Sequence, residues 1–224
     1  MTKSPKIVIL FGRSGCGKGT QAKLLQKDFK FDYLGTGDLV RARVKQNDFS
    51  GRKLKEVLKN GKLAPTFLVF NMWSEAIGQI KKNKGSRLKG LIVDGSPRAL
   101  IEARLMDQVF DWYDWQNVQA VLIDVSEQEA YDRLTKRRIC QDCGRLIPWV
   151  EGFKDLKTCD KCQGKLISRP DDTPKAIKSR LTFYKENVQP AVDFYKKEDR
   201  LIKVNGEQSI DQVYQEILKK LKLK

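Results

Sequence analysis

The chain has 224 residues, 40% of them hydrophobic, with a formal net charge of +16 and no histidine. This length supports one sizeable core with small appended lobes, and the lack of histidine excludes a Ser-His-Asp triad and a histidine general base. No apolar run approaches the ~20 residues of a membrane helix, and no signal-peptide pattern opens the chain, so we expect a cytoplasmic protein without membrane contact. A basic chain favours anionic partners, although a solvated lysine surface explains most of the excess charge equally simply.

Apolar runs and helical periodicity alternate along the chain. We expect strands at residues 6–11, 90–94, 118–125 and 201–204. We expect helices at residues 19–29, 36–46, 51–60, 66–82, 99–112, 126 to about 138, 173–196 with a bend near Pro190, and 209–221. This order predicts an α/β fold, with a parallel sheet flanked by helices on both faces and a binding crevice at the carboxyl ends of the strands.

A glycine-rich segment, GRSGCGKGT at residues 12–20, stands between the first expected strand and the first expected helix. This is the context of a phosphate-binding P-loop, in which glycines let backbone N–H groups point inward at phosphate oxygens and the helix N-terminus adds positive charge. The segment therefore predicts an ATP site in which Lys18 reaches the β- and γ-phosphates. The ATP-binding residues of this cradle are Gly15, Cys16, Gly17, Lys18, Gly19 and Thr20.

Four cysteines form the pattern Cys140-x2-Cys143 and Cys159-x2-Cys162. Each pair, with a glycine close behind it, predicts a tight knuckle that presents two thiolates, and two knuckles complete a closed tetrahedral zinc site. Two disulfides or free thiols are the competing interpretations, and a cytoplasmic location argues against disulfides. Four cysteine ligands leave no open position, so the zinc would be structural.

The wording Gly-Lys-Gly-Thr-Gln in the cradle resembles that of adenylate kinases and their relatives, and the resemblance extends over nearly the whole chain. It is similar to the family at residues 34–41 (LGTGDLVR), at residues 94–98 (DGSPR), at the arginines entering the cysteine unit, at the segment leaving it, and at the late turn VNG of residues 204–206. The entering arginines are Arg133, Arg137 and Arg138, and the leaving segment is Arg169-Pro170-Asp171-Asp172 with Arg180. The family has a zinc-bearing lid at this place.

The resemblance implies a role for each matched residue. Arg41 and Arg98 should hold the phosphate of a nucleoside monophosphate, while Arg137, Arg169 and Arg180 should close around the transferring group, because a planar guanidinium binds phosphate oxygens in pairs. Arg133 should pack on the ATP adenine, with Gln208 in the same site. The monophosphate site should comprise Thr36, Arg41, Lys62, Leu63, Ala64, Gly95, Arg98, Glu102, Arg169 and Arg180. The catalytic set should be Lys18, Asp94, Arg98, Arg137, Arg169 and Arg180.

Two aspartate positions have a less direct interpretation. Asp94 ends a hydrophobic strand and is expected to anchor Mg²⁺ through water. Asp171 and Asp172 precede Pro174 and are either helix-capping carboxylates or, as in the family, partners of the lid arginines.

These inferences predict a P-loop core of residues 1–34, 65–135 and 174–224, a helical monophosphate-binding lobe at residues 35–64, and a zinc lid at residues 136–173. The expected reaction is reversible phosphoryl transfer from MgATP to AMP, giving two ADP for nucleotide homeostasis, by a monomer that closes its lid over both nucleotides. A kinase preferring GMP or another monophosphate is the first alternative. A zinc-ribbon nucleic-acid-binding ATPase is the second, although no specific nucleic acid is expected.

The chain departs from the family wording at Ser14, Ser96, Ala99 and Glu102. Glu102 replaces the glutamine expected at the acceptor base. An ionised carboxylate only accepts hydrogen bonds, so it suits the two adjacent donors of guanine better than adenine, which presents an acceptor beside its amino group. Alternatively, Glu102 points to solvent or pairs with Arg98 or Arg104. The base preference therefore stays open, with AMP the expected acceptor.

Overall fold

A computed structural model describes residues 4–59, 63–169 and 172–223 of the chain. It divides into two compact units, which we describe separately. Unit 1 comprises residues 1–11, 22–122 and 187–202, and unit 2 comprises residues 12–21, 123–186 and 203–224. Within the described ranges, no helix is long and apolar enough to cross a membrane.

Five strands form a mostly parallel sheet with the order β2-β3-β1-β4-β8, which belongs to unit 1 except for the last residues of β4 and β8. Their bounds are Lys6–Phe11 (β1), Asp32–Gly35 (β2), Gly90–Asp94 (β3), Val118–Asp124 (β4) and Leu201–Asn205 (β8). β1 pairs in parallel with β3, from Lys6 opposite Gly90 to Leu10 opposite Asp94. All four expected strands are present, and the α/β class with a parallel sheet flanked by helices is confirmed.

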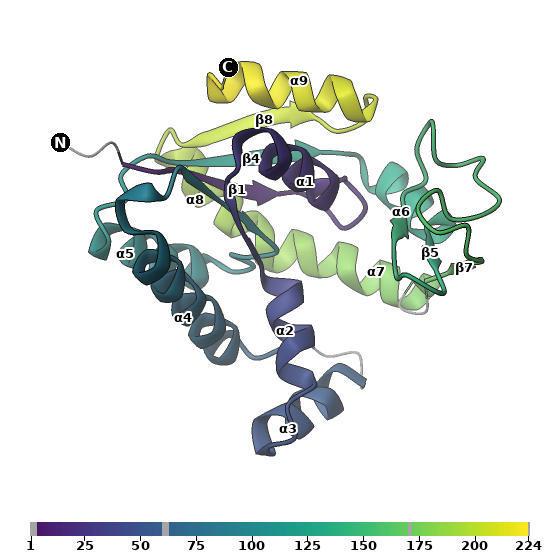
Figure 1. The fold of residues 1–224 in the computed structure, drawn as a ribbon, viewed down its shortest axis with the longest axis horizontal. Helices are drawn as coiled ribbons and strands as arrows, with labels where there is room; N and C mark the ends of the chain where they lie inside the picture. Colours follow the sequence, from purple (N-terminus) through teal and green to yellow (C-terminus); the bar gives the residue numbers. More distant parts are fainter. Residues whose placement is uncertain (1–3, 60–62, 170–171, 224) are drawn as a thin grey trace. The chain divides into compact units, whose positions relative to one another are not determined.

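Helices α4 (Thr66–Lys84), α5 (Leu100–Trp112) and α8 (Gln189–Lys197) supply much of the core of unit 1. Trp73, Phe110 and Tyr195 are buried in this core with the apolar side chains of β1 and β3. Helices α2 (Thr36–Val44) and α3 (Phe49–Lys59) make a small helical lobe beyond β2, and α4 and α5 run side by side (Figure 1). The sheet thus fixes the loops that follow β2 and β3, where the acceptor-site residues were predicted.

Unit 2 carries a three-stranded antiparallel sheet with the order β6-β5-β7, formed by Arg138–Cys140 (β5), Leu146–Ile147 (β6) and Leu166–Ser168 (β7). This sheet and its loops stand beyond the ends of α6 (Glu127–Lys136) and α7 (Pro174–Phe183) (Figure 1). Helix α9 (Ile210–Leu221) begins with a capping box between Ser209 and Gln212. Helix α1 (Lys18–Phe29) starts in unit 2 and continues into unit 1.

The structure differs from the expected elements in several places, of which three concern whole elements or their division. β2 was not predicted, because its four residues (DYLG) are too few to show alternation and it depends on pairing with β3. The helix expected to reach about residue 138 ends at Lys136, and Arg138 opens β5. The long helix at 173–196 is divided: α7 ends at Phe183 and a π-helical turn, Tyr184–Val188, precedes α8. Pro190 explains the division, because proline lacks an N–H and its ring excludes the carbonyl of the residue four positions earlier.

Candidate functional site

The glycine-rich cradle lies in unit 2, between the end of β1 and the start of α1. Gly12, Gly15 and Gly17 have φ values of +144°, +88° and +99°, which L side chains rarely adopt. A Cβ added at Gly12 would lie 2.5 Å from both Cys16 Sγ and the carbonyl oxygen of Ile123, so a side chain does not fit there. The Lys18 ammonium donates to the carbonyl oxygens of Gly12 (2.7 Å) and Arg13 (3.2 Å). The loop therefore holds the Lys18 ammonium against its own carbonyl oxygens, and this ammonium supplies the positive charge that an anion site needs.

A hollow of about 390 Å³ in unit 2 is lined by Arg13, Asp124, Val125, Ser126, Asn205 and Glu207. Arg13 donates to the carbonyl oxygen of Val125 at 2.8 Å, and the Glu207 carboxylate accepts from the N–H of Ser126 at 2.7 Å. Gly206 donates to the carbonyl oxygen of Asp124 at 2.7 Å, which closes the late turn predicted for the adenine site. Sequence reasoning missed Arg13, Asp124 and Glu207. Asp124 ends β4, and a polar residue ending a central strand was the signal available.

Arg133 and Gln208 both lie against this turn. Arg133 is buried, donating from Nε to Glu129 Oε1 (2.6 Å) and from a terminal amino group to the carbonyl oxygen of Gly206 (3.0 Å). Gln208 donates to the carbonyl oxygen of Asn205 (3.0 Å) and to the Glu216 carboxylate (2.8 Å). The structure thus brings together two of the residues predicted to bind the ATP adenine.

Arg137 and Arg180 meet at the carboxylate of Asp172. Arg137 donates from two nitrogens, at 2.8 and 3.0 Å, and Arg180 donates at 2.7 Å. The Asp172 side chain is 2% exposed, and although burial raises its pKa, the hydrogen bonds from both arginines hold the pKa below its ordinary value. The capping interpretation of Asp172 is wrong, because Thr173 is the N-cap of α7 and accepts from Ala176 at 3.3 Å. The carbonyl oxygen of Arg169 accepts from the N–H of Asp172 at 2.9 Å, so the backbone of Arg169 contacts the residue that carries this carboxylate.

The loop after β3 gathers three predicted acceptor-site residues within unit 1. Arg98 donates from Nε to the carbonyl oxygen of Gly95 at 2.6 Å, and its backbone N–H donates to Glu102 Oε2 at 2.9 Å. A Cβ added at Gly95 would lie 3.4 Å from an Arg98 amino group and 3.6 Å from the Thr36 Cβ, so Thr36 joins the group. Asp94, at the carboxyl end of β3, accepts from the Tyr33 hydroxyl at 3.2 Å.

Glu102 is only 3% exposed, so the interpretation that it points to solvent is wrong. Its carboxylate accepts from the backbone N–H of Arg98, so of the two arginines expected as partners it is Arg98 that it contacts. Burial raises the pKa of Glu102, and the N–H and charge of Arg98 oppose that rise. Burial also lowers the pKa of Arg98, against the charges of Glu102 and Asp94. A buried carboxylate with a raised pKa is a group that can change its proton occupancy when a ligand binds.

The remaining predicted acceptor residues are less closely gathered. Arg41 is exposed on α2 and pairs with Asp38 at 2.5 Å. Leu63 is 40% exposed, and Ala64 packs against the core of unit 1. Lys62 and Asp171 lie outside the described residues.

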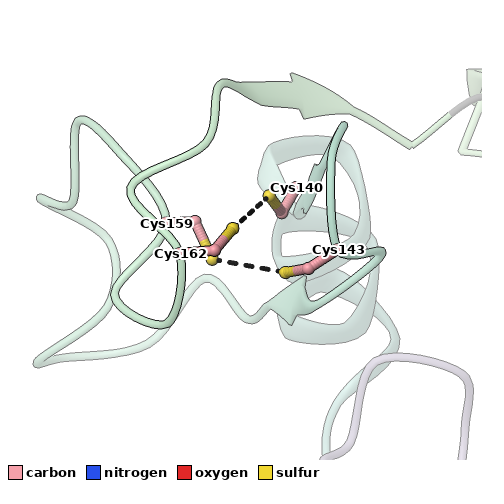
Figure 2. A group of neighbouring side chains, drawn as sticks. All are labelled: Cys140, Cys143, Cys159 and Cys162. Atoms are coloured by element: carbon pink, nitrogen blue, oxygen red, sulfur yellow. Dashed lines mark hydrogen bonds between the residues drawn. The ribbon is translucent and has the colours of Figure 1, made fainter.

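The four cysteines converge in unit 2, with their Sγ atoms all within 4.8 Å of one another (Figure 2). Cys140 Sγ lies 3.5 Å from Cys162 Sγ, and Cys143 Sγ lies 3.7 Å from Cys159 Sγ. These separations exclude the ~2.05 Å bond of a disulfide and match the ~3.8 Å expected between sulfurs on tetrahedral zinc with bonds of ~2.3 Å. The four cysteines can therefore hold one metal ion with thiolate ligands.

The two knuckles have the same backbone hydrogen bonds. Gly144 donates to the carbonyl oxygen of Cys140 (3.0 Å), and Gln163 donates to that of Cys159 (2.8 Å). Gly144 and Gln163 both have positive φ, +69° and +60°. The second knuckle thus places glutamine, and not the glycine at 164, in the left-handed position. Burial raises the pKa of Cys159, but backbone N–H groups of Lys161 and Cys162 and neighbouring thiols lower it to about 7. The backbone N–H of Gly164 lowers the pKa of Cys162, but hydrogen bonds with Cys143 and Cys140 raise it to about 12, so Cys159 is the first of the two to become a thiolate.

Arg138 binds the backbone of the loop between the two knuckles. It donates to the carbonyl oxygens of Leu156 (2.5 Å), Phe153 (3.1 Å) and Lys154 (2.8 Å), which ties the loop between the knuckles to β5. Of the three entering arginines, Arg138 is therefore assigned to folding of the cysteine unit and Arg137 to the carboxylate cluster.

Comparison with known proteins gives one consistent result. Residues 10–200 match the family model described as adenylate kinase. The chain is 37% identical over 214 residues to the adenylate kinase of Thermotoga neapolitana, with 95% of each chain covered. It is also 37% identical over 208 residues to the adenylate kinase of Methanocella arvoryzae, covering 92% of this chain and 93% of the relative. The adenylate kinase of Chlamydia muridarum is 34% identical over 226 residues, covering 97% of this chain and 88% of the relative.

Proposed function

Because this chain belongs to the adenylate kinase family, it is an ATP-dependent nucleoside monophosphate kinase, and we propose that AMP is its main acceptor. The reaction is then reversible transfer of the γ-phosphoryl group from MgATP to AMP, giving two ADP. The observation that carries the proposal is the glycine cradle around the Lys18 ammonium, in a chain whose family match spans residues 10–200. Transfer between two nucleotides needs charge compensation and alignment more than covalent chemistry.

On the donor side, Gly15, Cys16, Gly17, Gly19 and Thr20 present backbone N–H groups to the ATP phosphates. Lys18 exchanges its bonds to the carbonyl oxygens of Gly12 and Arg13 for phosphate oxygens, so the cation is held in place before the nucleotide arrives. The hollow beside Asn205 and Glu207, with Arg133 and Gln208 at its turn, receives the adenine.

Three arginines surround the transferring phosphoryl group in this proposal. Arg137 and Arg180 are held by Asp172 until the phosphates compete for the same N–H donors, and Arg169 joins them from the turn before that carboxylate. A planar guanidinium stays charged and binds two oxygens at once, so these side chains neutralise charge that builds up during transfer.

On the acceptor side, Arg98 and Arg41 bind the phosphate of AMP, while Gly95, Thr36 and residues 62–64 shape the nucleoside site. Arg98 uses Nε for the Gly95 carbonyl, which leaves its two terminal amino groups to serve phosphate oxygens. Glu102 faces the base and replaces the amide that an adenine site would otherwise use. We therefore expect weaker base discrimination than a glutamine gives, with a GMP preference as the alternative that the carboxylate favours.

Two metals belong to the proposal. Cys140, Cys143, Cys159 and Cys162 hold a structural Zn²⁺, whose four thiolate ligands leave no position for chemistry. Asp94 holds Mg²⁺ through water, and Mg²⁺ neutralises phosphate charge when it is bound with ATP. The lid at residues 136–173 closes over both nucleotides and excludes water, while residues 35–64 cover the monophosphate. We place the enzyme in the cytoplasm as a monomer.

A coupled assay with ATP and each of AMP, GMP, CMP and UMP tests the function. We expect phosphorylation of AMP with the highest kcat/KM and little ATP hydrolysis without an acceptor. A higher kcat/KM for GMP would overturn the acceptor assignment and leave the kinase class. ATP hydrolysis that needs no monophosphate and rises with nucleic acid would favour the zinc-ribbon ATPase instead.

A further inference from the structure

The formal net charge of +16 is not accounted for by the nucleotide site. One uncompensated basic stretch outside that site runs between Glu75 and Asp94, where five cations and no acid occur. They are Lys81, Lys82, Lys84, Arg87 and Lys89. Lys81 is committed to packing, since its ammonium donates to the Tyr113 carbonyl oxygen at 3.1 Å and lies over the Tyr113 and Trp115 rings. The other four are exposed.

These cations lie where the chain passes from α4 to the amino end of β3, so they are near the amino ends of the strands of unit 1. The chain leaves α4, passes through a 3-10 turn at Gly85–Arg87 and enters β3 at Gly90. Lys6 N–H donates to the Lys89 carbonyl oxygen at 3.1 Å, so Lys89 lies beside the first residue of β1. The Lys84 ammonium lies 3.5 Å from Asp32 Oδ1, at the first residue of β2, which places exposed Lys30 nearby in the chain. We define the amino-edge surface as Lys30, Lys82, Lys84, Arg87 and Lys89.

The amino-edge surface is separate from the acceptor loop. Asp94, Gly95 and Arg98 follow the carboxyl end of β3, and the five residues of β3 span about 13–17 Å. Acids near the surface include Asp32, which pairs with Lys84, Asp28, two residues before Lys30 in the chain, and Asp114, which lies beside Ser4. The cations therefore outnumber the bordering acids, and none of them has a role in phosphoryl transfer.

We propose that the amino-edge surface binds the phosphate backbone of double-stranded nucleic acid without reading its sequence. Exposed Lys and Arg side chains on one face supply this kind of binding by releasing counterions from the duplex. The exposed large apolar side chains of the described residues are Phe49, Leu63, Phe67, Ile101, Trp112 and Leu146, none of which belongs to the surface. The surface thus lacks the aromatic platforms that hold single strands and the apolar wedge that supports membrane binding.

Trp112 does not change this inference. It is 81% exposed at the end of α5, next to Tyr113, whose carbonyl accepts from Lys81. Asp111 and Asp114 stand on either side of it in the chain, and their charges repel a phosphate backbone. Stacking of unpaired bases at this border is therefore disfavoured, which leaves the backbone phosphates as the ligand.

Fluorescence anisotropy with a labelled 24-base-pair duplex RNA, and with a duplex DNA of equal length, tests the proposal on the full-length protein between 50 and 200 mM KCl. With about 0.9 counterions released per phosphate contact, five cations predict a slope of log K against log salt between about −3 and −5. Arg87→Glu/Lys89→Glu should weaken binding at least about tenfold and bring the slope about 2 closer to zero. The variant should keep wild-type kinase activity, because neither residue belongs to the nucleotide site.

The matched control is Lys154→Glu/Lys157→Glu, which makes the same change in net charge at exposed positions of unit 2. It should bind duplex RNA like wild type. Equal loss in both variants would show that net charge alone attracts the polyanion, and would overturn the surface. Binding to vesicles of 30% phosphatidylserine in phosphatidylcholine, but not to either duplex, would assign the surface to a membrane and overturn the proposal. Absence of binding to duplex at 50 mM KCl would do the same.

Discussion

The two units of this molecule hold their phosphate-site arginines in opposite ways: a pair in unit 2 forms the first group, and Arg98 makes up the second group in unit 1. In unit 2, Arg137 and Arg180 donate together to the buried carboxylate of Asp172. In unit 1, Arg98 donates from Nε to a backbone carbonyl, that of Gly95, and its own N–H is held by Glu102. The first group therefore has its phosphate-binding donors occupied by a carboxylate, while the second keeps its terminal amino groups available.

This difference explains how the arginines of each group are held in place without nucleotide and can still bind phosphate. Two half-buried guanidiniums that lie together need a counter-charge, and Asp172 supplies it until phosphate replaces it. Burial lowers the pKa of Arg98, and the charges of Glu102 and Asp94 oppose that fall, so these carboxylates supply its counter-charge while the Gly95 carbonyl orients it. On the donor side, phosphate thus replaces the Asp172 carboxylate as the partner of Arg137 and Arg180. On the acceptor side, the Arg98 guanidinium is already oriented before phosphate binds.

The largest effect should come from the cradle that both groups serve. Lys18→Met should lower kcat by about a thousandfold or more, because the ammonium follows charge that develops on the transferring phosphoryl group. Steady-state kinetics measures the loss, and circular dichroism should show an unchanged fold.

Lys23→Met is the matched control, since Lys23 is an exposed lysine on the same helix, α1. It should turn over like wild type. Near-normal turnover of folded Lys18→Met would show that the cradle has no part in the mechanism. It would also contradict the idea that both arginine groups act on a phosphoryl group held there.

Loss of the zinc site should disturb the first arginine group and spare the second. Cys143→Ser should abolish stoichiometric zinc and lower Tm by about 10–15 °C, since a small knuckle unit lacks a core of its own and 1 kcal/mol shifts Tm by about 2–4 °C at this size. Hydrogen exchange should lose protection in residues 138–168, next to Arg137, while β3 and the Gly95 loop stay protected.

Gln141→Ala, in the first knuckle but outside the cysteine set, is the control and should keep one zinc per chain. Elemental analysis of wild type that finds no zinc, or finds iron, contradicts the assignment. Equal loss of protection in β3 would mean that the two arginine groups share one folding unit.

Some of this arrangement could be read from the sequence and some could not. The cradle and the cysteine pairs were predictable because short spacings fix local backbone geometry, and the structure gives both knuckles one hydrogen-bond pattern. The meeting of Arg137, Asp172 and Arg180 required tertiary contacts across 35 residues, so spacing left the role of Asp172 open. The burial of Glu102 was likewise hidden, because a glutamate on a helix is usually exposed.

Local overrides explain the remaining differences. β2 forms because it pairs with β3, and a sequence of only four residues does not indicate such pairing. The helix at α3 begins at Phe49, earlier than expected, because the Asp48 carboxylate accepts from the N–H of Gly51 at 2.8 Å and caps it. Gln163 in a left-handed conformation shows that the knuckle geometry overrides the preference for glycine.

Asp172→Asn should sharpen the contrast through its pH dependence. Because the folded pKa of Asp172 lies below its ordinary value of 3.8, its contribution to stability is complete above that value and is lost as pH falls through the folded pKa. The variant should lose about 2–3 kcal/mol at pH 7, since two guanidiniums lose the buried carboxylate that they share, and the difference from wild type should shrink toward pH 3. Urea unfolding at both pH values measures it.

Asp160→Asn is the control for that prediction. Asp160 pairs with Arg145 at 2.7 Å, but the two side chains are 32% and 37% exposed, so its loss should cost less than about 1 kcal/mol. Equal losses for the two variants would show that burial of the Asp172 carboxylate contributes nothing, and that Arg137 and Arg180 are held no more strongly than an exposed pair such as Arg145 and Asp160.

The smallest effect, and the most informative about the acceptor side, should come from Glu102→Gln. Ionised Glu102 accepts hydrogen bonds only, so it can take the adenine amino group but opposes the N1 lone pair; the protonated acid donates to N1 as well. Burial raises the pKa of Glu102, so the acid form persists to higher pH than for an exposed glutamate. In wild type, kcat/KM for AMP should therefore fall as pH rises through that pKa, whereas Glu102→Gln should be nearly flat and about tenfold better for AMP at high pH.

The control and the set of substrates separate base reading from the hold on Arg98. Glu75→Gln removes an exposed acid of α4 and should leave every profile unchanged. Measuring kcat/KM for AMP, GMP, CMP and UMP between pH 5.5 and 8.5 then decides the role of Glu102. If its main work is to accept the Arg98 N–H, the substitution should lower all four values together, because phosphate binding is common to them. If it reads the base, the AMP to GMP ratio should rise in the variant. A wild type that prefers GMP would end the AMP assignment, and unchanged ratios and rates would remove Glu102 from both roles.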